Sequence, residues 1–199
     1  MKLKEIATIR TGLVLSRKKA AAHGISRHLY RLITLKSFSA AHIFPRIDYF
    51  DTFSAAEEVD EPYLGREGDV VVRLRAPVQA VYIDQKSAGS IIPSLMAVVR
   101  TESSAVDAAF LAHYLNTREA RKQIEKKLKG TTIPMIKTKD LDELEVVVPP
   151  LDVQRKTVSL MTLSLKERIL LEDLISQKQH FAQSALETII QQYKESNHA

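Results

Sequence analysis

The spacing of apolar residues along this chain changes near residue 150. Before that point, short runs of β-branched and aromatic residues are bounded by turn residues, which predicts strands over residues 29–36, 70–74, 80–83, 94–99 and 144–148. The acidic segment 44–61 breaks this pattern and predicts a surface loop. Asp107 is placed to cap a helix up to Gly130, because apolar residues recur there at helical intervals. The mixture predicts an α+β fold with a globular mixed α/β domain over residues 1–150.

A single long helix is predicted after Pro149-Pro150, so residues 151–199 form a separate element. No Gly or Pro interrupts residues 152–193, and a helix of that length extends roughly 60 Å at 1.5 Å per residue. Its apolar stripe, which shifts part-way along, consists of Val158, Met161, Leu165, Ile169, Leu174, Phe181, Ala185 and Ile189. This spacing is typical of a coiled-coil-type helix, and it predicts a partner helix from another copy or another protein.

Composition removes several classes of function. The 199 residues contain no cysteine, which excludes disulfides, thiolate metal sites and cysteine nucleophiles. No apolar run approaches the ~20 residues of a membrane-spanning helix, and the first residues lack the apolar core of a signal peptide. We therefore expect a cytoplasmic protein with no membrane partner. The sequence has no glycine-rich phosphate loop and no pattern for a methyl donor, so no cofactor is expected.

The positive charge is concentrated at the start of the chain. Residues 1–40 hold nine Lys and Arg against one acid, whereas residues 41–70 hold two against eight acids. Clustered cations of this kind favour a polyanionic partner such as nucleic acid. The alternative is a solubilising surface whose balancing acids lie elsewhere in the fold.

Two acidic positions invite a catalytic interpretation. Asp69 together with Asp84-Gln85-Lys86 has the layout of a metal-dependent nuclease, in which carboxylates hold Mg²⁺ beside a lysine. Both aspartates also stand where a turn would use them, and turn chemistry explains them without a metal. His23 and His28 have no third ligand nearby, so no zinc site is complete.

Several segments carry a resemblance to a known family. They are LKEIATIRTG at 3–12, YLGREGDVVVRLRAP at 63–77, the helical segment 110–130, and GTTIPMIKTKDLDELEVVVPPLDVQ at 130–154. With the long helix that follows, the chain resembles a specificity (S) subunit of a type I restriction-modification system over essentially its whole length. That family usually shows Pro-Pro-Leu-x-Glu-Gln after the last strand, and here Val153 stands in place of the glutamate.

The resemblance implies a function. Complete members of the family carry two target recognition domains and two long helices, whereas this sequence has one of each. Two copies are therefore expected to pair antiparallel through their helices and to read a bipartite, palindromic site on double-stranded DNA. The pair would position methyltransferase (modification) subunits, and a restriction subunit with them. The chain itself would not be an enzyme, because the modification subunits carry the cofactor and the chemistry.

Candidate DNA contacts follow from the basic residues. Phosphate contacts are expected from Arg17, Lys18, Lys19, Arg27 and Arg31. A second candidate is the loop containing Lys129, Thr131 and Thr132, together with Lys137; alternatively, lysines here complement the end of a helix. Arg73 and Arg75 lie two apart in a predicted strand and share a face that is either solvated or turned to DNA. The competing hypothesis for the whole chain is a stand-alone, helix-mediated DNA-binding or decoy module that directs no modification.

Overall fold

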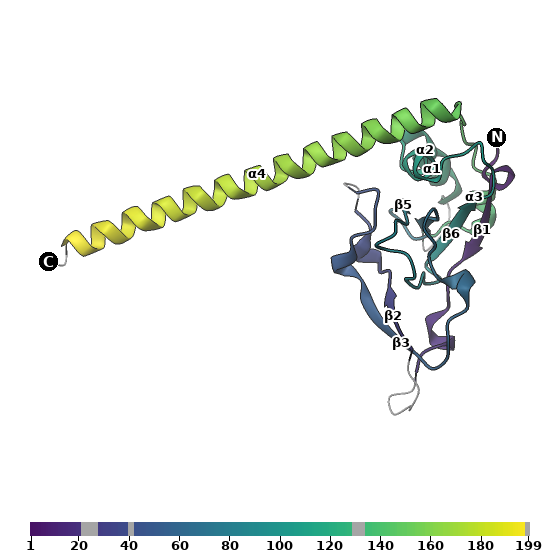
Figure 1. Ribbon diagram of the computed structural model, residues 1–199, viewed down its shortest axis with the longest axis horizontal. Helices are drawn as coiled ribbons and strands as arrows, with labels where there is room; N and C mark the ends of the chain where they lie inside the picture. The colour runs from purple at the N-terminus through teal and green to yellow at the C-terminus, as the bar shows by residue number, and fades with distance from the viewer. Residues whose placement is uncertain (21–27, 40–41, 129–133, 198–199) are drawn as a thin grey trace. The chain divides into compact units, whose positions relative to one another are not determined.

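The computed structural model describes residues 1–20, 28–39, 42–128 and 134–197, with the side chains of residues 195–197 left aside. The chain divides into two units, Met1–Val158 and Ser159–Ala199. Figure 1 shows the sheets and short helices of the first unit and the long helix α4. Among the residues described, no helix has both the length and the apolar character needed to cross a membrane.

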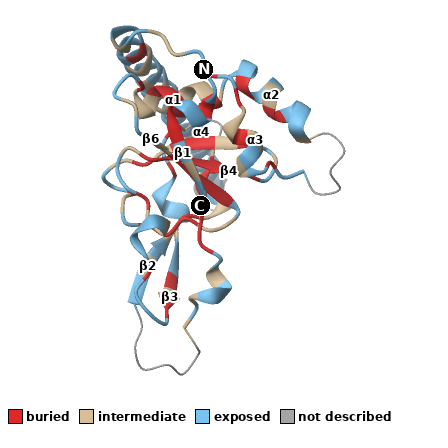
Figure 2. Ribbon diagram, turned by 90° about the vertical axis from the view of Figure 1, so that its right-hand side faces the viewer, coloured by how far each residue is buried: buried red, intermediate tan, exposed pale blue. Residues whose placement is uncertain are grey.

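The first unit is built on a four-stranded antiparallel sheet. Its strands are β1 (Ala7–Thr11), β6 (Met96–Thr101), β4 (Val70–Arg73) and β5 (Gln79–Tyr82), in the order β1-β6-β4-β5. The two central strands, β4 and β6, consist largely of buried residues, drawn red in Figure 2. Both faces of these strands are covered, so their residues form continuous apolar runs, and these runs allowed the strands to be predicted from the sequence.

A second sheet comes partly from the segment predicted to be a loop. Strand β2 (His28–Leu32) pairs with β3 (Asp51–Ala55), and β3 lies inside the acidic stretch 44–61. The loop prediction is wrong here because Phe53 and Ala55 alternate into a core with Leu13, Val59 and Ile91. The predicted strand 29–36 also ends early, at Leu32. In the part of the chain that the structure describes, five short 3-10 helices lie before and between the strands: Leu3–Glu5, Leu15–Arg17, Leu35–Ser37, Ile47–Tyr49 and Glu61–Tyr63.

The predicted helix after Asp107 is two helices, α1 (Ala108–Leu115) and α2 (Arg118–Leu128). The cap is as expected, since the Asp107 carboxylate accepts the backbone N–H of Phe110 at 3.0 Å. The break occurs at Asn116, whose carboxamide accepts from the N–H of Ala80 at 3.0 Å and donates to its carbonyl at 2.7 Å. A polar side chain thus turns from the helix to satisfy the open edge of β5.

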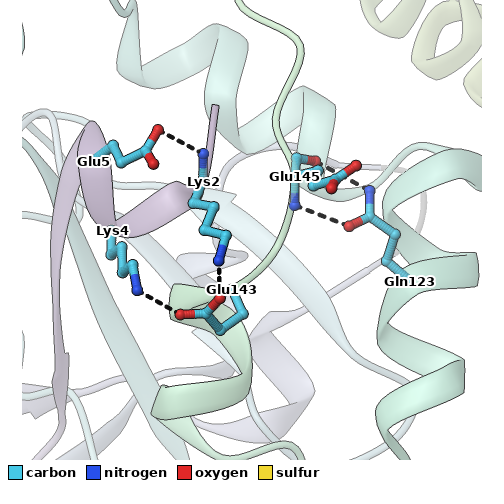
Figure 3. A network of polar contacts seen from close by, with 6 residues as sticks. All are labelled: Lys2, Lys4, Glu5, Gln123, Glu143 and Glu145. Carbon is cyan, nitrogen blue, oxygen red and sulfur yellow. Dashed lines mark hydrogen bonds and ion pairs between the residues drawn. The ribbon is translucent and has the colours of Figure 1, made fainter.

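Residues 144–148 do not form the predicted strand. Their pairing is with the start of the chain: Leu3 donates to the Leu144 carbonyl and Val146 donates to the Met1 carbonyl, both at 2.8 Å. Opposite, the Gln123 carboxamide donates to the carbonyl of Glu145 at 3.0 Å and accepts its N–H at 2.9 Å, as Figure 3 shows. The segment is thus held in an extended conformation between the N-terminal residues and α2. It follows the short helix α3, which spans Thr138–Asp142.

The final helix, α4, spans Leu151–Asn197 and has 47 residues, so the predicted long helix is confirmed. Its first turn is anchored in the first unit by Gln154, which is 0% exposed. The Gln154 carboxamide donates to the carbonyls of Ala105 at 2.8 Å and Pro149 at 2.6 Å, and it accepts the N–H of Asp107 at 2.9 Å. The neighbouring Val153, which replaces the family's usual glutamate, is 42% exposed and takes no part.

We predict that Gln154→Ala destabilises the first unit. The substitution leaves one N–H and two carbonyls without partners in a buried place, which costs on the order of 3 kcal/mol. Thermal or denaturant unfolding of the full chain measures the effect. The matched control is Gln183→Ala, because Gln183 is an exposed residue of α4 whose carboxamide bonds to Glu187, and the loss of that bond costs a few tenths of a kcal/mol. Equal stability of the two variants would contradict the anchoring role.

We also predict an acid-sensitive contribution from Glu143. Hydrogen bonds from Lys2 and Lys4, both 2.5 Å long, hold the pKa of Glu143 at about 2, against a usual 4.5. Because the folded-state pKa is the lower one, the stabilisation is present above about pH 4.5 and is lost as the pH falls toward 2. The melting temperature of Glu143→Gln should therefore lie below that of the parent chain at pH 7, and the gap should narrow below pH 4.5. Glu125→Gln, at an exposed position of α2, should show no such narrowing.

Candidate nucleic-acid interface

Part of the N-terminal positive charge is neutralised within the fold. Lys2 and Lys4 both contact Glu143. The Lys18 ammonium lies 2.6 Å from Glu57 and 3.7 Å from Asp60, and the hydrogen bond to Glu57 raises the pKa of Lys18. The acids that balance these three cations do come from elsewhere in the sequence. Lys18 is thus engaged with acids of the segment after β3.

Arg17 and Lys19 are the exposed cations of the same segment, and neither side chain makes an ion pair with the residues that the structure describes. Their positions are fixed by the backbone, since Ala20 donates to the Ser54 carbonyl at 3.0 Å and Ala56 donates to the Lys18 carbonyl at 2.9 Å. Residues 18–20 therefore run along the outer edge of β3. Arg17 and Lys19 are therefore exposed to solvent beside the small sheet, which is the two-stranded sheet of β2 and β3.

Arg31 is turned toward the protein. Its guanidinium donates to the carbonyls of Lys86 at 2.6 Å and Ala88 at 2.8 Å, and it lies 6.0 Å from the centre of the Phe50 ring. These bonds connect β2 to the loop after β5. The geometry favours a structural role for Arg31 over a phosphate contact.

The expectation that Arg73 and Arg75 share a strand face is wrong, because β4 ends at Arg73. The Arg73 side chain donates to the carbonyls of Arg75 at 3.0 Å and Ala76 at 3.3 Å. Burial, and secondly the charge of Arg75, lower the pKa of Arg73. The Arg73 guanidinium thus closes a turn, and two of its donors are engaged by the protein backbone.

Arg75 and Lys137 are exposed and come from two segments that pair with each other. Arg75 forms a bridge with Met135, Ala76 donates to the Pro134 carbonyl at 3.0 Å, and Ile136 donates to the Leu74 carbonyl at 2.9 Å. Lys137 follows as the residue that precedes α3. The pairing of these two segments thus forms a second exposed basic surface, made by Arg75 and Lys137. Arg27, Lys129, Thr131 and Thr132 lie outside the described residues.

The apolar stripe of α4 is largely open to solvent. Met161, Leu174, Phe181 and Ile189 are 44%, 47%, 77% and 62% exposed, while Val158, Leu165, Ile169 and Ala185 are half-buried. Further exposed apolar residues, which the predicted stripe did not include, are Leu160, Leu163, Leu170, Leu171, Ile175, Leu186 and Ile190. Apolar exposure therefore extends around more of the helix than a narrow seam requires.

The two aspartates with the nuclease layout are both engaged by protein donors. Asp69, 1% exposed, takes two hydrogen bonds of 2.7 Å from the Arg100 guanidinium and one of 2.9 Å from the N–H of Arg66. This carboxylate raises the pKa of Arg100. Gly68 adopts a φ of 91°, which supports the turn interpretation. Among the described residues, no three His, Cys, Asp or Glu side chains gather as a metal site would need.

Most of the chain matches one known protein family. A family model described as the type I restriction modification DNA specificity domain matches residues 1–178. The chain belongs to this family. No curated protein matches it.

Solved structures show the same fold. The HsdS subunit from Thermoanaerobacter tengcongensis aligns with a TM-score of 0.62 at 16% identity, over 85% of this chain and 42% of that one. A chain from work on complex assembly and conformational transition of the type I R-M system aligns with a TM-score of 0.57 at 21% identity, over 86% and 39%. The type I S subunit from M. genitalium gives a TM-score of 0.50 at 14% identity, over 84% and 39%. This chain therefore spans about two fifths of the length of the chains it matches. The predicted α+β fold with a long C-terminal helix is confirmed.

Proposed function

We propose that this chain is the DNA-recognition component of a type I restriction-modification complex, with no catalytic role of its own. The observation that carries this proposal is the family match over residues 1–178. The exposed cations beside the small sheet are consistent with it, because phosphate contacts supply much of the affinity of a DNA-binding protein. The complex would act on cytoplasmic double-stranded DNA together with methyltransferase subunits and a restriction subunit.

Arg17 and Lys19 are the first candidates for phosphate contact, because both are exposed and unpaired with the described acids. Arg75 and Lys137 are the second. Arg27, Lys129, Thr131 and Thr132 remain candidates on sequence grounds alone. Lys18 would have to leave Glu57 before it could contact a phosphate, so we assign it a lesser contribution.

We further propose that two copies pair through α4. A helix of 47 residues with exposed leucine, isoleucine and phenylalanine side chains along it needs a partner to cover them. A second copy supplies a surface of the same length and pattern. An antiparallel two-fold pair would present two identical recognition domains, so its target would be a bipartite palindrome. Other exposed faces of the paired helices would remain for methyltransferase subunits.

DNA binding should weaken in the double variant Arg17→Glu/Lys19→Glu. The loss of two phosphate contacts should lower affinity for any duplex by about tenfold or more and reduce the salt slope by about two. Fluorescence anisotropy over a series of salt concentrations measures both quantities. The control is Lys122→Glu/Lys178→Glu, which makes the same charge change at exposed positions of α2 and α4. Equal binding by the two double variants would show that this surface does not contact DNA.

Pairing through α4 should fail in Leu174→Glu/Phe181→Glu. Two carboxylates seven residues apart would be buried without partners in the helix seam, so the chain should sediment as a monomer where the parent sediments as a dimer. The matched control, Ser176→Glu/Gln183→Glu, places the same charges at the same spacing on exposed polar positions. These positions lie on the opposite face of the helix, two residues along from Leu174 and Phe181, so this variant should stay dimeric. A monomeric parent, or a dimer that survives the first substitution, would contradict the pairing.

A further inference from the structure

We propose that the loop of residues 84–89 is a base-reading element and that Gln85 is a specificity-determining residue within it. This inference rests on the proposed DNA-recognition function and names one place where the sequence of the DNA is read. Three features carry it: the backbone of the loop is fixed from within, it is fixed from outside by Arg31, and it displays polar side chains that no other part of the described structure uses.

The loop is rigid because Asp84 and Ser87 bond to each other repeatedly. The Asp84 carboxylate accepts the Ser87 N–H at 3.0 Å and the Ser87 hydroxyl at 2.5 Å, and the Asp84 N–H donates to that hydroxyl at 3.0 Å. The Asp84 carbonyl also accepts the N–H of Ala88 at 2.9 Å. Ser87 is 0% exposed. The Asp84 carboxylate is thus bonded within the loop, and the layout that suggested a nuclease is a turn.

The loop is also bonded to its surroundings at three of its residues, Lys86, Ala88 and Gly89. Arg31 of β2 bonds to the carbonyls of Lys86 and Ala88, at 2.6 and 2.8 Å. Gly89 has a φ of 76° and donates its N–H to the Gly65 carbonyl at 2.8 Å. Since two separate segments hold the backbone, the loop has a defined shape before any ligand arrives. Arg31 is accordingly a positioning residue.

Gln85 and Lys86 are exposed on this fixed backbone, and neither side chain makes a hydrogen bond or an ion pair with the residues that the structure describes. Leu29 lies on the same strand face as Arg31, two residues away, and is 71% exposed. A carboxamide can bond bidentately to the N6 and N7 atoms of adenine, a lysine suits guanine or a phosphate, and an apolar side chain suits the thymine methyl group. Exposed glutamine and lysine residues are common on loops. These two can discriminate between bases because the backbone that carries them is fixed, and hydrogen-bond readout of a base requires side chains that are positioned before binding.

The test is selection from a pool of randomised double-stranded DNA, followed by sequencing of the bound molecules, with the full chain. The parent chain should enrich one sequence. Gln85→Ala should lose the preference for adenine at one position, and affinity for the enriched site should fall by about ten- to a hundredfold. Affinity for unrelated duplex should not change, since the substitution alters no charge. Gln85→Glu should move the preference at that position toward cytosine, whose N4 group donates to a carboxylate.

Two further variants separate the roles. Arg31→Lys keeps the charge but cannot hold both carbonyls in one plane, so it should relax the same base position as Gln85→Ala and leave the remaining positions intact. Gln183→Ala, at an exposed residue of α4, should leave the enriched sequence unchanged.

The outcomes distinguish this inference from the proposed function. A parent chain that enriches no sequence overturns DNA recognition itself. A parent that enriches a sequence, with Gln85→Ala and Gln85→Glu enriching the same one at the same affinity, overturns the reading loop and leaves the function in place. Relaxation in Arg31→Lys at positions other than the one set by Gln85 removes Arg31 from the positioning role.

Discussion

The buried carboxamide of Gln154 is the contact on which the organisation of the first unit depends most. It joins the end of the segment 144–150, the approach to α1 and the first turn of α4, and both its amino group and its carbonyl oxygen are hydrogen-bonded to these segments. The start of α4 is thus bonded to Asp107, the residue whose carboxylate caps α1. Glutamine suits this place because it can donate twice and accept once without carrying a charge into a buried region.

Two other carboxamides act on the same principle. Asn116 satisfies the edge of β5, and Gln123 satisfies the backbone of Glu145. An amide side chain presents the same donor and acceptor as a peptide group, so each replaces a neighbouring strand where none is available. The antiparallel sheet can therefore stop at β5, and the extended segment before α4 can remain ordered without being part of a sheet.

The sequence was sufficient for elements whose residues are buried as a run or repeat at a regular interval. It predicted β4, β6 and α4, and the motif around Pro149-Pro150 led to the correct family. It failed at β3, where two inward residues are hidden among acids, and at the break between α1 and α2, where Asn116 bonds to a strand 36 residues away. Contacts between residues far apart in the sequence also limited the prediction of the candidate DNA contacts. Lys18 and Glu57 are 39 residues apart and Lys2 and Glu143 are 141 apart, so no local pattern indicated which cations the fold itself would neutralise.

The way the loop 84–89 is held has a consequence for how this protein can change over generations. Its shape is determined by Asp84, Ser87, Gly89 and a residue of β2, and none of these bonds involves the side chains at positions 85 and 86. Substitutions at those two positions therefore leave the fold intact while altering the chemistry displayed. A single substitution at one of these positions would therefore be enough to change the binding preference, with no compensating change in the core.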